Sequence, residues 1–384
     1  MKWLAPNWQA LAAVIFSIAA LGLGAMTSVE ADALTNPTAT IDYPYIATKA
    51  LILGLLLLTA LLSMIRLPAI ASAVLLFLGA HLTAWLLIAD ISGFEGTALW
   101  PFFLALAAAW LLAWRCVGLL AAMRPATRSK GAVLRLLIPA IFGVWILILW
   151  EAITRGAGVP FILLPPPSAI GARIAGSLPI LVADVRQTIF KAVIFGFVVG
   201  SLAGFLTAIL ADRVAFLRKG LLPIGNMVSA LPIIGIAPIM VMWFGFDWQS
   251  KAAVVIVMTF FPMLVNTVAG LDAAGSMERD LMHTYASSYR QMLLKLRLPA
   301  AAPFIFNALK INSTLALIGA IVAEFFGTPI VGMGFRISTE IGRLNVDMVW
   351  AEIAVAAVAG SLFYGVIALV ERATTFWHPS LRGG

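Results

Sequence analysis

Long apolar runs dominate this sequence and limit what it can fold into. Residues 46–65 read IATKALILGLLLLTALLSMI, with a single charge near the start. A helix that crosses the hydrocarbon core of a bilayer needs about twenty such residues. Ten runs of this kind are predicted to form spanning helices, near 8–29, 46–65, 69–90, 98–122, 133–154, 188–211, 223–246, 252–271, 300–326 and 349–371.

The composition supports a membrane protein. The chain is 62% hydrophobic and 11% charged, whereas soluble domains are roughly half apolar and a quarter charged. The net charge of +8 is spread over short loops, which indicates the basic cytoplasmic loops of a membrane protein rather than a nucleic-acid partner. We therefore predict an all-α polytopic membrane protein of about ten transmembrane helices.

The distribution of charge predicts the orientation. With the N-terminus inside, most of the 25 Lys and Arg residues fall on the cytoplasmic side, as the positive-inside rule requires. Both termini are then cytoplasmic. Acidic residues favour the opposite side, because eight of them fall outside: Glu30, Asp32, Asp42, Asp90, Glu95, Asp247, Glu340 and Asp347. The first run also fits a signal peptide that ends near Ala31-Asp32-Ala33, although its length and the polar residues before that site favour a retained span.

A basic connector, RPATRSKGAVLR at 124–135, marks the clearest boundary. It predicts a four-helix membrane extension over 1–123, a cytoplasmic linker over 124–135, a six-helix domain over 136–375 and a cytoplasmic tail over 376–384. We find no function for the four leading helices.

Metal and disulfide chemistry find little support in the sequence. Cys116 is the single cysteine, and His81, His283 and His378 lie in different segments. A disulfide within the chain is impossible, and a metal site is not expected. The chain also has no GxxxxGK[ST] phosphate-binding loop and no HExxH motif.

A charged stretch interrupts the apolar runs at 277–306, MERDLMHTYASSYRQMLLKLRLPAAAPFIF. Leu281, Tyr285, Ser288, Met292 and Leu296 recur at helical spacing and predict an amphipathic helix over 277–297 that lies along the membrane. Pro299 then begins the next span, where its missing N–H is harmless. Physics alone leaves open whether this is an ordinary interfacial helix or a docking element.

The stretch resembles the signature loop of bacterial binding-protein-dependent ABC permeases. Their pattern is Glu-Ala-Ala, three residues, Gly, nine residues, Ile, one residue, Leu-Pro. Anchoring on Leu298-Pro299 places Asp280 at the Glu, Leu281-Met282 at the Ala pair and Leu296 at the Ile. Ala286 stands where the pattern has glycine, so we expect no sharp turn there.

Further motifs resemble the nitrate, sulfonate and taurine branch of these permeases. They are PFILLPPPSAI at 160–170, LPIIGIAPIMVMWFGF at 231–246, FFPMLVNTVAG at 260–270 and ALKINSTLALIGAIVAEFFG at 308–327. The resemblance covers roughly 140–375 and implies a type I ABC importer core in the last six helices. It implies that the chain is a permease subunit rather than an enzyme and that it lies in a bacterial inner membrane.

The resemblance also implies partners and a substrate class. A separate cytosolic ATPase would use ATP, an external binding protein would deliver the solute, and a second permease copy would complete a homodimer. This chain itself would bind no cofactor. The solute would be a sulfonate-, nitrate- or taurine-like anion or a pyrimidine or vitamin precursor, and we favour a pyrimidine precursor.

Two groups of residues follow as candidate sites. The resemblance implies ATPase coupling by Asp280, Leu281, Met282, His283, Ala286, Tyr289, Arg290, Leu298 and Pro299. The helix-breaking prolines suggest that 229–244 lines a translocation path, with Pro232, Pro238 and Trp243 as candidates. Asn266 and Asn312 are further candidates because they are polar residues within predicted spans. Simple kinking, interfacial anchoring by Trp243 and packing by the asparagines are the alternatives.

Two smaller features also permit predictions. Gly196, Gly200 and Gly204 form a small-residue ladder, which serves either packing within the chain or a contact between subunits. Glu324 is costly in lipid unless it is paired or near the surface, and we expect it near the outer end of its span.

The main alternative function is a secondary transporter driven by an ion gradient. Such folds often show internal repeats and charges near the bilayer midplane. The sequence shows no convincing repeat and few such charges. The charged stretch at 277–297 discriminates, because an importer needs an ATPase there and a secondary transporter does not.

Overall fold

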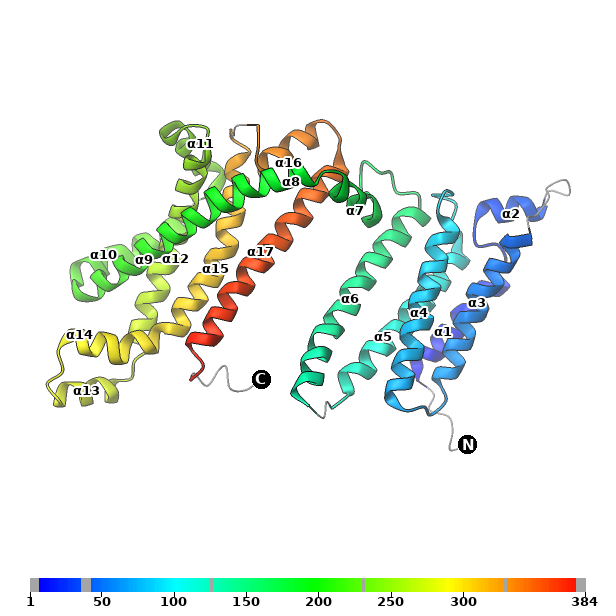
Figure 1. Cartoon of the computed structure of the whole chain (residues 1–384), viewed down its shortest axis with the longest axis horizontal. Helices are drawn as coiled ribbons and strands as arrows, with labels where there is room; N and C mark the ends of the chain where they lie inside the picture. Colours follow the sequence, from blue (N-terminus) through cyan, green and yellow to red (C-terminus); the bar gives the residue numbers. More distant parts are fainter. Residues whose placement is uncertain (1–6, 36–42, 125–126, 230–231, 328–329, 378–384) are drawn as a thin grey trace. The chain divides into compact units, whose positions relative to one another are not determined.

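The computed structural model describes residues 7–35, 43–124, 127–229, 232–327 and 330–377, and these residues are predominantly helical. This confirms the all-α class. The chain divides into two compact units, Met1–Ile170 and Gly171–Gly384, and each is described by itself (Figure 1). Helix α7, Pro167–Gly176, crosses the boundary between them.

The first unit packs through small side chains. Its helices are α1 (Trp8–Gly22), α2 (Ser28–Thr35), α3 (Tyr43–Ser63), α4 (Ala69–Ile91), α5 (Trp100–Ala122) and α6 (Arg128–Gly156). Helix α5 packs against α1, α4 and α6. Many of the buried positions are alanines, among them Ala13, Ala80 and Ala109, which lets helices approach closely where lipid supplies no hydrophobic driving force.

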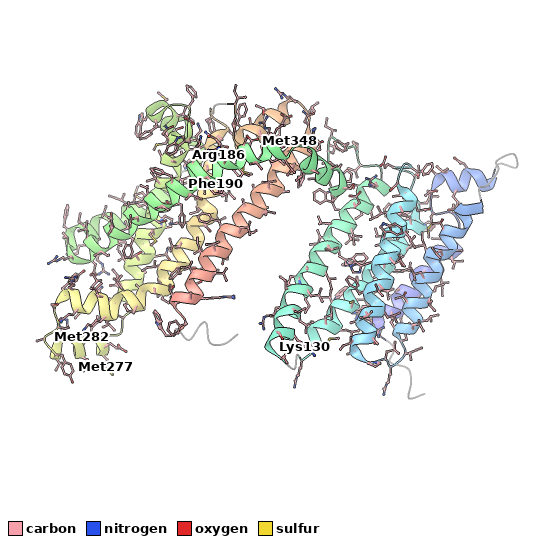
Figure 2. All side chains as sticks on the ribbon, viewed as in Figure 1. Lys130, Arg186, Phe190, Met277, Met282 and Met348 are labelled. Atoms are coloured by element: carbon pink, nitrogen blue, oxygen red, sulfur yellow. The ribbon has the colours of Figure 1, made fainter. Side chains whose placement is uncertain are left out.

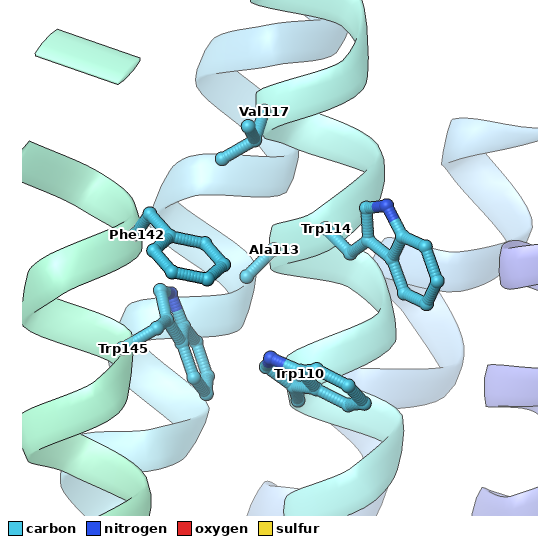
Figure 3. A pocket seen from close by; sticks show the side chains of 6 residues that line it. All are labelled: Trp110, Ala113, Trp114, Val117, Phe142 and Trp145. Carbon is cyan, nitrogen blue, oxygen red and sulfur yellow. The ribbon is translucent and has the colours of Figure 1, made fainter. Parts of the chain in front are cut away.

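An aromatic cavity of about 340 Å³ lies between α5 and α6. Trp110 and Trp145 extend toward each other from these two helices (Figure 3). Trp114 completes the aromatic wall and meets Trp8 of α1 edge to face, with ring centroids 5.3 Å apart. Ala113, Val117 and Phe142 complete the lining of this cavity.

The second unit is built around α12, Trp248–Asp272. It packs against α9 (Ile194–Arg213) on one side and α15 (Leu298–Glu324) on another (Figure 1). Helix α17, Val346–Thr374, packs on α15 and on α16, Met333–Gly342. The remaining elements are α8 (Leu178–Val185), η1 (Arg186–Val193), α10 (Ala215–Ser229), α11 (Ile233–Phe244), α13 (Ser276–Thr284), α14 (Tyr289–Met292) and η2 (Leu293–Arg297).

The number of spans is the part of the prediction that the structure does not confirm. Among the described residues, 7 helices are long and apolar enough to cross a membrane. Three more apolar helices are shorter, Trp8–Gly22, Thr48–Ser63 and Ile233–Phe244. The segment predicted as one span over 223–246 forms two helices, α10 and α11, and Pro232 is the N-cap residue of the second.

The boundary predicted at 124–135 lies partly inside a helix. Residues 128–135 form the first turns of α6, and Thr127 caps that helix by accepting a hydrogen bond from the backbone N–H of Lys130. By its contacts α6 belongs to the first unit. The assignment of residues 136–375 to one transport domain, and of 376–384 to a tail, stays a prediction, and residues 378–384 lie outside the described part.

The glycine ladder of α9 packs against α12 within the chain, as one of the two interpretations predicted. A Cβ atom added at Gly196 would lie 2.8 Å from the carbonyl oxygen of Ala252, and one at Gly200 would lie 2.7 Å from that of Ile256. Real Cβ atoms do not approach so closely, so the two backbones touch because the side chains are absent.

We expect Gly200→Ala to destabilise the second unit. The added methyl must displace the α12 backbone, and overpacking of this kind costs about 1–3 kcal/mol, or roughly 2–10 °C in Tm for a unit of this size. Thermal unfolding of the detergent-purified protein measures it. Gly365→Ala on α17 is the matched control, because no atom lies within 4 Å of its added Cβ. Equal Tm values for the two variants would show that the seam is not tightly packed.

Candidate coupling site

The charged stretch forms a helix, a tight turn and a second helix. Helix α13 ends at Thr284 and α14 begins at Tyr289. Between them Ala286 adopts a φ of +52°, the left-handed conformation that glycine favours. The expected single helix over 277–297 is therefore wrong, and so is the expectation that Ala286 needs no sharp turn.

Hydrogen bonds explain why the turn forms without glycine. The carbonyl oxygen of Met282 accepts from both the backbone N–H and the Oγ of Ser287, at 3.1 and 2.7 Å. The N–H of Ala286 donates to the carbonyl of His283 at 2.9 Å. These bonds satisfy carbonyls that the end of α13 would otherwise leave without partners, and they offset the strain of a left-handed alanine.

A capping box starts the second helix. The Ser288 hydroxyl accepts from the Gln291 N–H, and the Ser288 N–H donates to the Gln291 side chain at 2.8 Å. From Tyr289 the helical run continues through the π-helical η2 and α15 for 36 residues, to Glu324. Pro299 lies in the first turn of α15, as predicted. Helix α14 is thus continuous with a helix that is long and apolar enough to span a membrane.

Helix α13 buries none of its residues. Met277 and Leu281 are 81% and 57% exposed, and Tyr285 at the helix end is 78% exposed. They are spaced four apart and share one face, and Met277 and Met282 are labelled on this helix in Figure 2. Asp280 and His283 are also exposed, whereas Met282 is half-buried. An apolar face rimmed by charges is typical of a protein-binding surface.

A buried ion pair holds the start of η2–α15 in place. The guanidinium of Arg297 donates to both carboxylate oxygens of Asp212, each at 2.7 Å. Their side chains are 10% and 3% exposed. The Nε of Arg297 donates to the carbonyl of Leu271 at 3.0 Å. The pair therefore joins three elements, the ends of α9 and α12 and the start of α15.

Tyr289 belongs to this cluster. Its hydroxyl donates to Asp212 at 2.9 Å, and the Arg213 guanidinium lies 5.4 Å from its ring centroid. Tyr289 is half-buried, whereas Arg290 beside it is exposed. Of the residues predicted to couple to an ATPase, four are half-buried: Met282 in α13, and Tyr289, Leu298 and Pro299 in the helical run that follows the turn.

Sequence reasoning missed Asp212 and Arg297. The two residues are 85 positions apart in the chain, and each ends or begins an apolar run where a charged residue is ordinary. The single available signal was a carboxylate at the end of one span and a basic residue at the start of another.

The predicted pathway residues do not form one cluster. Asn312 is fully buried and donates to the Ser201 Oγ at 3.0 Å and the Thr259 carbonyl at 2.8 Å. These bonds join α15 to α9 and α12, which is the packing role that was left open. Asn266 donates to the Pro262 carbonyl one turn back in α12, at 2.8 Å. Pro238 lies within α11, whose Trp243 is 70% exposed.

A second polar cluster lies at the other end of α15. Glu324 is the last residue of α15, as expected for a position near the end of the span, but it is 2% exposed. It accepts from the Thr188 hydroxyl and the Gly334 N–H, each at 2.7 Å. Asp184 accepts from the Gly332 N–H at 2.6 Å and from Arg336 at 2.9 Å. Glu324 is therefore tolerated within an apolar helix because its buried carboxylate has hydrogen-bond partners.

We expect Arg297→Met to be strongly destabilising. It leaves the Asp212 carboxylate buried without its cation, which costs about 3–5 kcal/mol, or roughly 6–20 °C in Tm. Arg218→Met is the matched control, because Arg218 and its partner Asp272 are 37% and 39% exposed and Asp272 keeps its 3.7 Å contact with Arg297 in this variant. An exposed pair contributes about 0–1 kcal/mol. If both variants unfold at the same temperature, the buried pair is not a stabilising connection.

We expect Ala286→Gly to stabilise the turn. A left-handed alanine costs about 1 kcal/mol that glycine avoids, so amide hydrogen exchange over 276–292 should slow about fivefold. Arg279→Gly in the interior of α13 is the control and should speed exchange, because glycine destabilises a regular helix. Faster exchange in Ala286→Gly would contradict the left-handed turn.

Comparison with known proteins identifies a family match for the region that contains this site. Residues 196–376 match the family model described as "Binding-protein-dependent transport system inner membrane component". The matched region includes α9, α12, the turn at Ala286 and α15. It begins well after the first unit ends.

Individual relatives carry related names. The chain is 28% identical to a probable ABC transporter permease protein of Haemophilus influenzae over 62% of this chain and 97% of the relative. It is 28% identical to the formylaminopyrimidine transport permease protein ThiX of Halalkalibacterium halodurans, over 62% of this chain and 95% of the relative. It is 28% identical to a putative aliphatic sulfonates transport permease protein, SsuC, of Bacillus subtilis, over 68% and 93%. Residues 196–376 therefore carry the inner membrane component domain of binding-protein-dependent transport systems, a family of transport subunits rather than enzymes, and the relatives are named as ABC transporter permeases.

Proposed function

We propose that the chain forms the translocation pathway of an ATP-driven importer and that α13 is the surface on which a cytosolic ATPase docks. The observation that carries the proposal is the exposed apolar face of α13, made of Met277, Leu281 and Tyr285, directly before a helical run of 36 residues. The family match supports an ATPase partner in general.

The geometry suggests how ATP-driven movement reaches the membrane. An ATPase that binds α13 and then moves applies force to the turn at Ala286. The hydrogen bonds of that turn and the Asp212–Arg297 pair transmit this force to α9, α12 and α15. Rigid elements held in this way move as a body, so closure of the ATPase shifts the population between inward- and outward-facing states.

Two further features of the importer are part of the proposal. The chain has no GxxxxGK[ST] loop, so the ATPase uses the ATP and the permease binds no cofactor of its own. A second copy of the chain forms the other half of the pathway as a homodimer, and the complex lies in a bacterial inner membrane with both termini cytoplasmic.

The transported solute is small and polar, and an external binding protein delivers it. The names of the relatives include permeases for formylaminopyrimidine, aliphatic sulfonates and taurine. From these we favour a small nitrogen heterocycle such as a pyrimidine precursor. Binding of candidate solutes to the cognate binding protein, measured by calorimetry, tests this choice independently of the permease.

We expect Leu281→Glu to uncouple ATP hydrolysis from uptake. A carboxylate placed in an apolar contact loses solvation, and a cost above about 1.4 kcal/mol reduces docking tenfold. Uptake by proteoliposomes with the complete complex should fall tenfold or more. Phe376→Glu is the control, because Phe376 is 68% exposed beyond the end of α17. Normal uptake by Leu281→Glu would show that α13 is not the docking surface.

Crosslinking distinguishes an importer from a secondary transporter. Cysteines introduced at His283 and Arg290, both exposed, should crosslink to an ATPase in the detergent-solubilised complex. Cys116 is buried and supplies little background. If the chain purifies alone, forms no crosslink and moves solute down an ion gradient, the importer proposal is wrong and a secondary transporter is correct.

A further inference from the structure

The first unit carries an apolar groove that the transport proposal does not use. It lies between α4, α5 and α6 and has a volume of about 870 Å³. Its walls include Ile70, Val74, Phe77, Leu120 and Val133. All three helices are long and apolar enough to span a membrane, so the groove runs along the part of the chain that lipid surrounds.

One end of the groove is basic. Arg124, Ser129 and Lys130 line it there, where α5 has ended and α6 begins. Lys130 is labelled at the start of α6 in Figure 2. The first turn of a helix adds a partial positive charge to these side chains. Arg124 and Lys130 are both exposed, so an anion can reach them from the headgroup region.

Carboxylates do not neutralise this end of the unit. The described residues that line the groove include no Asp or Glu. Residues 96–150 contain no acid at all, whereas Asp90, Glu95 and Glu151 lie at or near the opposite ends of the same helices. Among the described residues that line the groove, the basic end therefore has no carboxylate partner.

We propose that this groove binds an anionic phospholipid. The phosphate lies against Arg124, Lys130 and the N-terminal turn of α6, and the acyl chains lie along the apolar walls. A basic pocket between membrane helices is the arrangement that recognises anionic headgroups. A soluble anion would contact the basic end but would leave the apolar walls unoccupied. A zwitterionic lipid would bring its own cationic group next to Arg124 and Lys130.

Lipid titration followed by native mass spectrometry tests the proposal. The probes are phosphatidylglycerol and phosphatidylcholine with identical acyl chains, added to the delipidated full-length protein. Each basic residue near a membrane surface contributes roughly fivefold to anionic-lipid affinity. Arg124→Gln combined with Lys130→Gln should therefore weaken phosphatidylglycerol binding roughly 25-fold and leave phosphatidylcholine binding nearly unchanged.

A charge-matched control separates the groove from general surface charge. Arg66→Gln combined with Arg135→Gln removes the same charge from exposed residues that do not line the groove, and it should change binding less than twofold. Equal losses in the two double variants would overturn the proposal, because the affinity would then come from the basic surface as a whole.

A second variant tests the apolar part while all charges remain. Val74→Trp places an indole in the groove from a position that is 51% exposed, so folding does not depend on it. Phosphatidylglycerol binding should weaken at least fivefold. Unchanged binding in Val74→Trp, or binding of glycerol phosphate as tight as that of phosphatidylglycerol, would show a surface site for soluble anions and would overturn the lipid assignment.

Discussion

The Asp212–Arg297 ion pair is the interaction that holds the charged stretch at 277–297 against the rest of the second unit. Both oxygens of Asp212 accept from one guanidinium, and Tyr289 occupies a further position on the same carboxylate. A buried pair of this kind gains little net stability over apolar side chains, but removal of one partner is costly. Its consequence here is positional, because it fixes the ends of three helices at the point where α13 and α14 leave the membrane domain.

Helix α15 is held at both ends and in the middle by polar contacts. Arg297 fixes the segment that leads into it, Asn312 bonds to α9 and α12 at its centre, and Glu324 bonds to η1 and α16 at its far end. Each of these groups would be expensive in lipid without partners. A helix restrained at three levels does not bend freely. Under the coupling proposal, a force applied at α14 therefore moves its neighbours as well. This rigidity is what a transmission element needs.

The sequence predicted the fold class well because hydrophobic run length and the cost of unpaired polar groups in lipid leave few choices. It predicted the glycine seam of α9 for the same reason, since three glycines four apart in an apolar run permit close backbone contact. It failed at Ala286, where hydrogen bonds from Ser287 to Met282 overrode the conformational preference of alanine. It also missed the Asp212–Arg297 pair, because a contact between residues so distant in the chain leaves no trace in local periodicity.

The first unit is less constrained by the comparisons, because the family match begins at residue 196 and the relatives' alignments of 240 and 265 residues reach only part of it. The positions and contacts of its basic side chains are nonetheless informative. Arg115 is buried, and its two terminal guanidinium nitrogens donate to the Ser63 hydroxyl and carbonyl, at 2.9 and 2.7 Å. Arg124 and Lys130 are exposed beside an apolar groove in a stretch of chain without carboxylates. Under the lipid proposal these two cations pair with an anionic headgroup, and lipid composition is then a variable to which this unit responds.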